Sequence, residues 1–171
     1  MGSIAAIVIT YHPGPELPYN IQSYLDQVDH LYIADNSVPK LTLSDDILSN
    51  PKITLINDGG NEGIALRLNQ VAEQAKKAGY QWLLTMDQDS YFESEHIASY
   101  FDYMQAYPTA TDVAMFGVET VNKQELIADL NEPVDQLITS GSLLNLSLYA
   151  DLGPFDEKLF IDEVDHEYCY R

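Results

Sequence analysis

The chain is poor in basic residues and in cysteine. Its 171 residues include 27 acidic but only 8 basic side chains, so its formal net charge is −19 at pH 7. A protein of that charge repels nucleic acid, which excludes a nucleic-acid-binding protein. The single cysteine, Cys169, rules out a disulfide within the chain and fits a reducing compartment.

Long apolar runs are also missing. No run approaches the roughly 20 residues that span a membrane, and the first residues carry no basic segment typical of a signal peptide. We therefore expect no transmembrane segment and a cytoplasmic protein. Hydrophobic residues still make up 46% of the chain, which is enough for the core of one globular domain.

Short apolar runs alternate with segments of helical periodicity. Strands are expected at residues 4–10, 30–34, 52–56, 113–118 and 135–138, with a further strand in the stretch 82–90 that carries Asp87 and Asp89. Helices are expected at 17–27, 63–78, 94–107 and over the last ten residues. This alternation predicts an α/β fold with three α/β/α layers, in which helices cover both faces of a mostly parallel central sheet.

The most informative segment is an apolar run that stops at Asp87-Gln88-Asp89. Side chains alternate along an extended segment, so Asp87 and Asp89 are expected to point the same way. At the carboxyl end of a central strand, where open α/β sheets bind ligands, the pair would hold Mg²⁺ or Mn²⁺, which in turn binds a diphosphate. The alternative is a solvated turn, because Asp and Ser are ordinary turn residues.

Polar clusters also follow the three earlier strands. They are Thr10-Tyr11-His12, Asp35-Asn36 and Asn57-Asp58. Because the carboxyl ends of parallel strands lie along one edge of a sheet, four such clusters predict a binding cleft there.

Six segments in this order resemble the family 2 glycosyltransferases, especially their bacterial rhamnosyltransferase-like branch. They are Val8-Ile9-Thr10-Tyr11, Asp35-Asn36-Ser37, Asn61-Glu62-Gly63-Ile64-Ala65 with Asn69, Met86-Asp87-Gln88-Asp89-Ser90, Thr139-Ser140-Gly141-Ser142, and Phe160-Ile161-Asp162-Glu163-Val164-Asp165 through Arg171. The resemblance implies the GT-A fold, the Rossmann-like fold of nucleotide-diphospho-sugar transferases. Members of the family usually continue further, so residues 1–171 are expected to be the nucleotide-sugar-binding part of one catalytic domain, truncated at its C-terminus.

The resemblance also implies an activity. The expected protein is an inverting hexosyltransferase that uses Mn²⁺ or Mg²⁺ and a dTDP- or UDP-sugar, with rhamnose from dTDP-rhamnose favoured. The acceptor would be a glycan or a lipid-linked molecule in cell-surface polysaccharide synthesis, which would place the protein peripherally at the inner membrane face. A homodimer is a further expectation. The alternatives are a non-catalytic nucleotide-sugar-binding domain and a metal-dependent phosphatase with Asp87 as its nucleophile.

Individual site residues follow from the same resemblance. Asp87 and Asp89 would hold the metal, and Ser140 and Gly141 would border the donor sugar and the acceptor. The nucleotide would be bound by Thr10, Tyr11, Asp35, Asn57, Gly63, Arg67 and Asp87.

The residues themselves leave other interpretations open for three of these positions. Asp35 can close an Asx turn after a strand. Gly63 can admit a tight backbone turn at a helix start. Arg67 can be an exposed helix cation.

The acceptor hydroxyl needs a general base, and the resemblance places it within residues 162–165. Many family members carry Glu-Asp where this chain has Asp162-Glu163, which leaves the base uncertain. Asp162 is favoured and Glu163 comes second, whereas Asp165 is expected to orient or cap the helix. Without the resemblance, these carboxylates simply favour a helix N-terminus.

Overall fold

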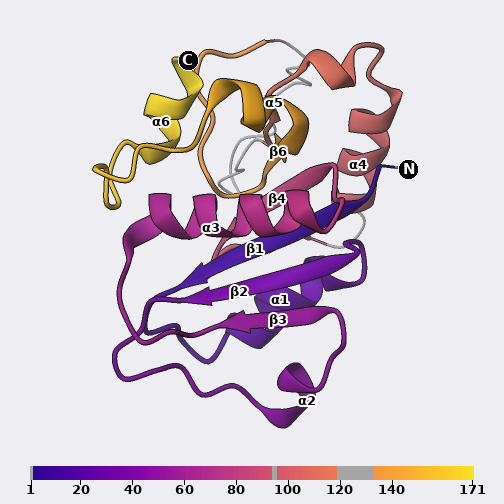
Figure 1. Ribbon diagram of the computed structural model, residues 1–171. Helices are drawn as coiled ribbons and strands as arrows, with labels where there is room; N and C mark the ends of the chain where they lie inside the picture. The colour runs from indigo at the N-terminus through magenta and orange to yellow at the C-terminus, as the bar shows by residue number, and fades with distance from the viewer. Residues whose placement is uncertain (1, 94–95, 119–132) are drawn as a thin grey trace, which may run out of the picture.

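The computed structural model describes residues 2–93, 96–118 and 133–171. In this part of the chain one six-stranded sheet has the order β3-β2-β1-β4-β6-β5 (Figure 1). The strands are β1 (Ile4–Thr10), β2 (His30–Asp35), β3 (Ile53–Ile56), β4 (Trp82–Asp87), β5 (Met115–Phe116) and β6 (Ser142–Asn145). The first four strands along the chain are parallel, whereas β6 is antiparallel to both β4 and β5.

Helices cover both faces of the sheet. They are α1 (Leu17–Leu25), α2 (Asp45–Leu48), α3 (Gly63–Lys77), α4 (His96–Ala106), α5 (Leu146–Leu152) and α6 (Val164–Cys169), with a short 3₁₀ helix, η1 (Ala110–Asp112). Side chains that alternate along β1 face two different apolar layers. Ala6 and Val8 pack in the layer with α1 and α4, and Ala5 and Ile7 pack in the layer with α3, α5 and α6. The predicted three-layer α/β/α arrangement is therefore confirmed.

The predicted elements differ from the structure mainly after residue 112. The strand expected at 113–118 is only β5, and the strand expected at 135–138 is wrong because these residues form no ladder. Side chains bind this backbone instead: Ser142 Oγ donates to Ile138 O at 2.6 Å, and Leu137 N donates to Cys169 Sγ at 3.3 Å. Pairing with β4 starts only at Ser142. The last helix begins at Val164, two residues later than expected.

Asn69 holds the C-terminal segment against α3. Its Nδ2 donates to Phe155 O and to Glu157 Oε1, both at 3.0 Å, and its Oδ1 accepts from Phe155 N at 2.8 Å and from Tyr149 Oη at 3.1 Å. The side-chain amide of Asn69 thus forms hydrogen bonds through both its nitrogen and its oxygen with residues far away in the sequence. This contact places the segment leading to α6 beside the sheet edge. No helix in the described ranges is long and apolar enough to span a membrane.

Candidate active site at the carboxyl edge of the sheet

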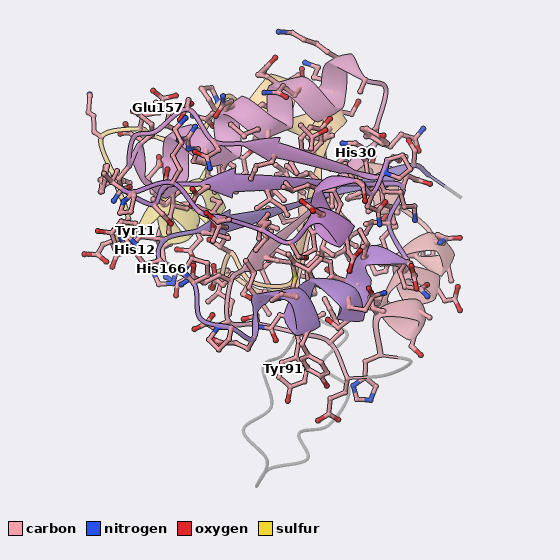
Figure 2. All side chains as sticks on the ribbon, turned by 90° about the horizontal axis from the view of Figure 1, so that it is seen from below. Tyr11, His12, His30, Tyr91, Glu157 and His166 are labelled. Carbon is pink, nitrogen blue, oxygen red and sulfur yellow. The ribbon has the colours of Figure 1, made fainter. Side chains whose placement is uncertain are left out.

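The carboxyl ends of β1, β2 and β4 meet at one edge of the sheet. In the ladders Thr10 lies opposite Asp35, and Ile9 lies opposite Asp87. The side chains of Tyr11 and His12 project together just beyond the end of β1 (Figure 2), with their ring centroids 4.5 Å apart. The predicted convergence of the strand-end clusters is therefore confirmed.

Asp35 closes a turn inside this edge. The carboxylate is only 1% exposed. Its Oδ1 accepts from Thr10 Oγ1 at 3.1 Å and from Ser37 N at 3.0 Å, and its Oδ2 accepts from Leu41 N at 2.8 Å. The bond to Ser37 makes the Asx turn that the sequence left as the alternative. Thr10 is buried as well, so both side chains stabilise the backbone at this edge of the sheet from inside the protein. Their direct contact with a nucleotide stays a prediction.

Arg67 is completely buried, so its interpretation as an exposed helix cation is wrong. Its two Nη atoms donate to the two oxygens of Asp58, Nη1 to Oδ2 at 2.8 Å and Nη2 to Oδ1 at 2.6 Å. Nη1 also donates to Gln70 Oε1 at 2.9 Å, and Nη2 donates to Gly60 O at 3.1 Å. Nε donates to Asn36 Oδ1 at 2.8 Å. These contacts use all five N–H groups of the guanidinium. In this conformation Arg67 organises the loop after β3 and has no N–H left for a phosphate, so its predicted contact with a nucleotide is not supported.

The Arg67 guanidinium also changes the titration of its partner. Its hydrogen bonds and positive charge lower the pKa of Asp58 to about 2, and the carboxylate in turn raises the pKa of Arg67. Neither Asp58 nor Asn36 was assigned a role from the sequence. Their places in polar clusters at the ends of β3 and β2 were the only signal.

Gly63 brings the C-terminal segment to the same edge. Its φ of 78° lies in the left-handed region, and an added Cβ would lie 2.5 Å from Phe160 O. Ile64 N donates to that carbonyl at 2.7 Å. The tight backbone turn that the sequence left as the alternative is confirmed, and the close approach to Phe160 adds a second reason for glycine. Contact of Gly63 with a nucleotide stays a prediction. Nearby, Asn57 Nδ2 donates to Leu41 O at 3.4 Å, and Asn57 Oδ1 is buried with no hydrogen-bond partner among the described residues. Its contact with a nucleotide stays a prediction.

β4 ends at Asp87, and Gln88 and Asp89 form a turn in which Ser90 N donates to Asp87 O at 3.2 Å. The strand alternation that was expected to align Asp87 with Asp89 therefore does not extend to Asp89. Burial and the charges of Asp89 and Asp165 raise the pKa of Asp87. Mutually repelling carboxylates are a donor set that a hard divalent cation suits. Among the residues that the structure describes, no group of three or more His, Cys, Asp or Glu side chains is arranged to hold a metal ion. Binding of a cation by one or two carboxylates, completed by phosphate oxygens and water, therefore stays a prediction.

The three candidates for the general base occupy different surroundings. Asp162 and Glu163 are exposed, and Glu163 faces His166 with 3.2 Å between Oε2 and Nδ1. Asp165 is half-buried, and its Oδ2 accepts from Thr139 N at 3.0 Å. Through Thr139, Asp165 is connected to the strand that ends at Asp87, and its charge is among those that raise the pKa of Asp87. Which of the three carboxylates is the base stays a prediction.

The loop before β6 joins α6 to β4. Thr85 Oγ1 donates to Thr139 O, and Gly141 N donates to Thr85 O at 2.8 Å. Because Thr139 also binds Asp165, one run of hydrogen bonds connects the strand of Asp87 to the helix of Asp165. Ser140, which is 6% exposed, and Gly141 lie in this loop, and their place beside the donor sugar and acceptor stays a prediction.

Comparison with known proteins supports the family resemblance seen in the sequence. The model of the family described as glycosyl transferase family 2 matches residues 5–149. The dTDP-rhamnosyl transferase RfbF of Shigella flexneri is 28% identical over 186 residues. This alignment covers 99% of the present chain and 62% of RfbF, so the chain spans less than two thirds of that protein.

Two solved structures share the fold. TarS of S. aureus has a TM-score of 0.62 and 18% identity, over 98% of this chain and 33% of TarS. GalNAc-T7, whose structure contains UDP, GalNAc and Mn²⁺, has a TM-score of 0.65 and 12% identity, over 99% of this chain and 40% of that protein. With the observed sheet, these similarities confirm the predicted GT-A fold.

Proposed function

The chain belongs to glycosyl transferase family 2, and from this premise we propose that it is the donor-binding part of an inverting rhamnosyltransferase that uses dTDP-rhamnose. The acceptor would be a hydroxyl group of a glycan or lipid-linked molecule in cell-surface polysaccharide synthesis. The name of the Shigella relative supports the choice of donor. The observation that carries the proposal is the run of hydrogen bonds from Asp165 through Thr139 to Thr85, which connects Asp165 to the strand that ends at Asp87.

In this proposal Asp89 and Asp87 hold Mn²⁺ or Mg²⁺. When bound, the metal supplies charge that stabilises the departing diphosphate. Asp89 is exposed and Asp87 is half-buried, so the first can bind a metal from solvent while the second approaches the ribose or the sugar. Tyr11, with 53% of its surface exposed, offers its ring to the nucleoside. Ser140 and Gly141 border the transferred sugar.

Asp165 is the general base that this geometry favours over Asp162 and Glu163. Its carboxylate removes the proton from the acceptor hydroxyl as the acceptor oxygen bonds to the anomeric carbon. The bond from that carbon to the diphosphate breaks, and dTDP leaves from the opposite face, which inverts the configuration. Support comes from the hydrogen bond to Thr139, which orients Asp165, and from its electrostatic effect on Asp87.

Calorimetric titration of the chain with dTDP and UDP, with and without Mn²⁺, tests the donor site. We expect binding that requires Mn²⁺ and weakens on the order of a hundredfold in Asp89→Ala, because a direct ligand of the metal diphosphate is lost. Asp102→Ala, at an exposed position on α4, is the matched control. Binding that is indifferent to Mn²⁺ and to Asp89 would contradict the proposal.

Hydrolysis of dTDP-rhamnose, followed by chromatography of released dTDP, tests the base. Asp165→Asn should bind dTDP as the unmodified chain does and lose turnover by 10²–10⁴-fold, the usual contribution of a general base, whereas Asp162→Asn should keep it. The reverse pattern would return the role to Asp162. Binding without any turnover by the unmodified chain would support a non-catalytic nucleotide-sugar-binding domain. Hydrolysis of simple phosphate esters would support a phosphatase.

A further inference from the structure

Gln88 lies between Asp87 and Asp89, and its side chain contacts a different strand end. Its Oε1 accepts from Tyr11 N at 2.7 Å, and its Nε2 donates to Tyr11 O at 3.2 Å. Both ends of the amide therefore pair with both backbone groups of one residue. The ladder between β1 and β4 has its last pair at Ile9 and Asp87. Gln88 continues the connection between these two strands beyond the point where the backbone ladder stops.

Neighbouring contacts fix both partners of this pairing. Gln88 O accepts from Nδ2 of Asn20, a residue of α1 that is only 3% exposed, at 2.9 Å. On the other side His12 N donates to Ser37 Oγ at 2.8 Å. His12 has a φ of 45°, which is unfavourable for a residue with a side chain, so the surrounding contacts must hold the turn in place. Gln88 supplies the contact from the β4 side.

The ring of Tyr11 depends on this tether. It is 53% exposed and has the equally external His12 ring as its aromatic neighbour, in an edge-to-face contact (Figure 2). Since the apolar layers do not enclose the ring, the backbone of Tyr11 decides where the ring lies. The two hydrogen bonds between Gln88 and the backbone of Tyr11 therefore set the position of Tyr11 relative to the Asp87–Asp89 loop.

We propose that Gln88 is a positioning residue that keeps a fixed spacing between the Tyr11 ring and the Asp87–Asp89 pair. A nucleoside diphosphate carries its base and its diphosphate at two ends of one molecule, so a site that binds both needs such a spacing. This inference rests on the proposed function. A neutral amide is required because a carboxylate at position 88 cannot donate to Tyr11 O and would add a third negative charge beside the pair.

The test compares Gln88→Met, which keeps the length but loses both hydrogen bonds, with Gln88→Glu, which keeps the acceptor alone. Gln22→Met is the matched control, because Gln22 is exposed on α1 and donates within the helix to Asp26 at 3.4 Å. Affinity for dTDP in the presence of Mn²⁺ is measured by calorimetry, well below each melting temperature. We expect about tenfold weaker binding for Gln88→Met, the size of two lost neutral hydrogen bonds, and at least as much for Gln88→Glu.

A double-mutant cycle separates positioning from a general structural effect. If Gln88 acts through Tyr11, Gln88→Met should have no further effect on dTDP affinity in a Tyr11→Ala background. Unchanged affinity of Gln88→Met, or an equal loss in both backgrounds, would overturn the inference while the proposed function stands. Failure of the unmodified chain to bind dTDP or UDP would instead overturn the proposed function, and this inference with it.

Discussion

At the scale of single residues, Arg67 determines the shape of the loop after β3. Arginine is almost never fully buried unless its charge is paired, because removal from water is costly. Here Asp58 binds the guanidinium through both oxygens, while 53% of the Asp58 side chain remains exposed. The charge of the buried partner is thus compensated by a carboxylate that keeps part of its own hydration.

Replacement of Asp58 should destabilise the protein. Asp58→Ala leaves the Arg67 charge buried without its carboxylate, and we expect a loss of about 2 kcal/mol in the free energy of unfolding, a figure that allows for screening at this half-exposed site. Asp102→Ala, at an exposed position of α4, should change it by less than about 0.5 kcal/mol. Urea denaturation at pH 7 measures both values. Equal effects of the two substitutions would show that the pair adds nothing.

The same pair should make stability fall in acid. Because Arg67 lowers the pKa of Asp58 in the folded state to about 2 from 3.8, its contribution is fully present above pH 4. It should decline as the pH falls from about 4 and be lost as the pH passes below about 2, where the carboxylate binds a proton in both states. The difference in unfolding free energy between the unmodified chain and Asp58→Ala, measured at several pH values, should therefore shrink between pH 4 and 2. A constant difference would contradict this linkage.

Residue types near the site could be predicted, but several of their partners could not. The strand-end positions of Asp35 and Asp87 follow from local apolar runs. The burial of Arg67 depends on Asn36, which is 31 residues away, and on Asp58. No periodicity in the sequence encodes such pairings. The hydrogen bond between Thr139 and Asp165, which are 26 residues apart, could not be predicted for the same reason.

At the scale of elements, the start of α3 and the segment before α6 depend on each other. Gly63 and Gly79 both have positive φ, 78° and 90°, but only Gly63 has a neighbour in the way of a Cβ. Gly79→Ala should cost about 1 kcal/mol from backbone strain alone. Gly63→Ala should cost at least about 2 kcal/mol, because Phe160 O must also move. Urea denaturation of the two variants gives the difference, and equal losses would show that the Phe160 contact is easily displaced.

Element prediction succeeded where the signal is local. The periodicity of residues 63–78 and the apolar run of 4–10 correspond closely to α3 and β1. The start of β6 could not be predicted, because its ladder partner β4 lies far earlier in the chain. Its antiparallel direction and the shortness of β5 likewise depend on how the chain returns to the sheet.

At the scale of the whole molecule, the net charge of −19 opposes compaction. We expect the free energy of unfolding to rise when NaCl is increased from low ionic strength to about 0.1 M, where the Debye length is about 10 Å.

Mn²⁺ at the same ionic strength should stabilise the unmodified chain further but not Asp89→Ala, because only specific binding to the folded state adds stability beyond screening. Thermal melting measures both effects. Equal stabilisation of both proteins by Mn²⁺ would show that Mn²⁺ acts only by screening the negative charges of the protein.

The central place of β1 in the sheet has a consequence for synthesis on the ribosome. β1 is made before both of the strands that it pairs with, β2 on one side and β4 on the other. Until Asp87 has left the exit tunnel, one edge of the strand at the centre of the domain has no native partner, and open apolar edges pair readily with other chains. The nascent protein therefore passes through a stage in which a chaperone that covers strand edges would bind it best.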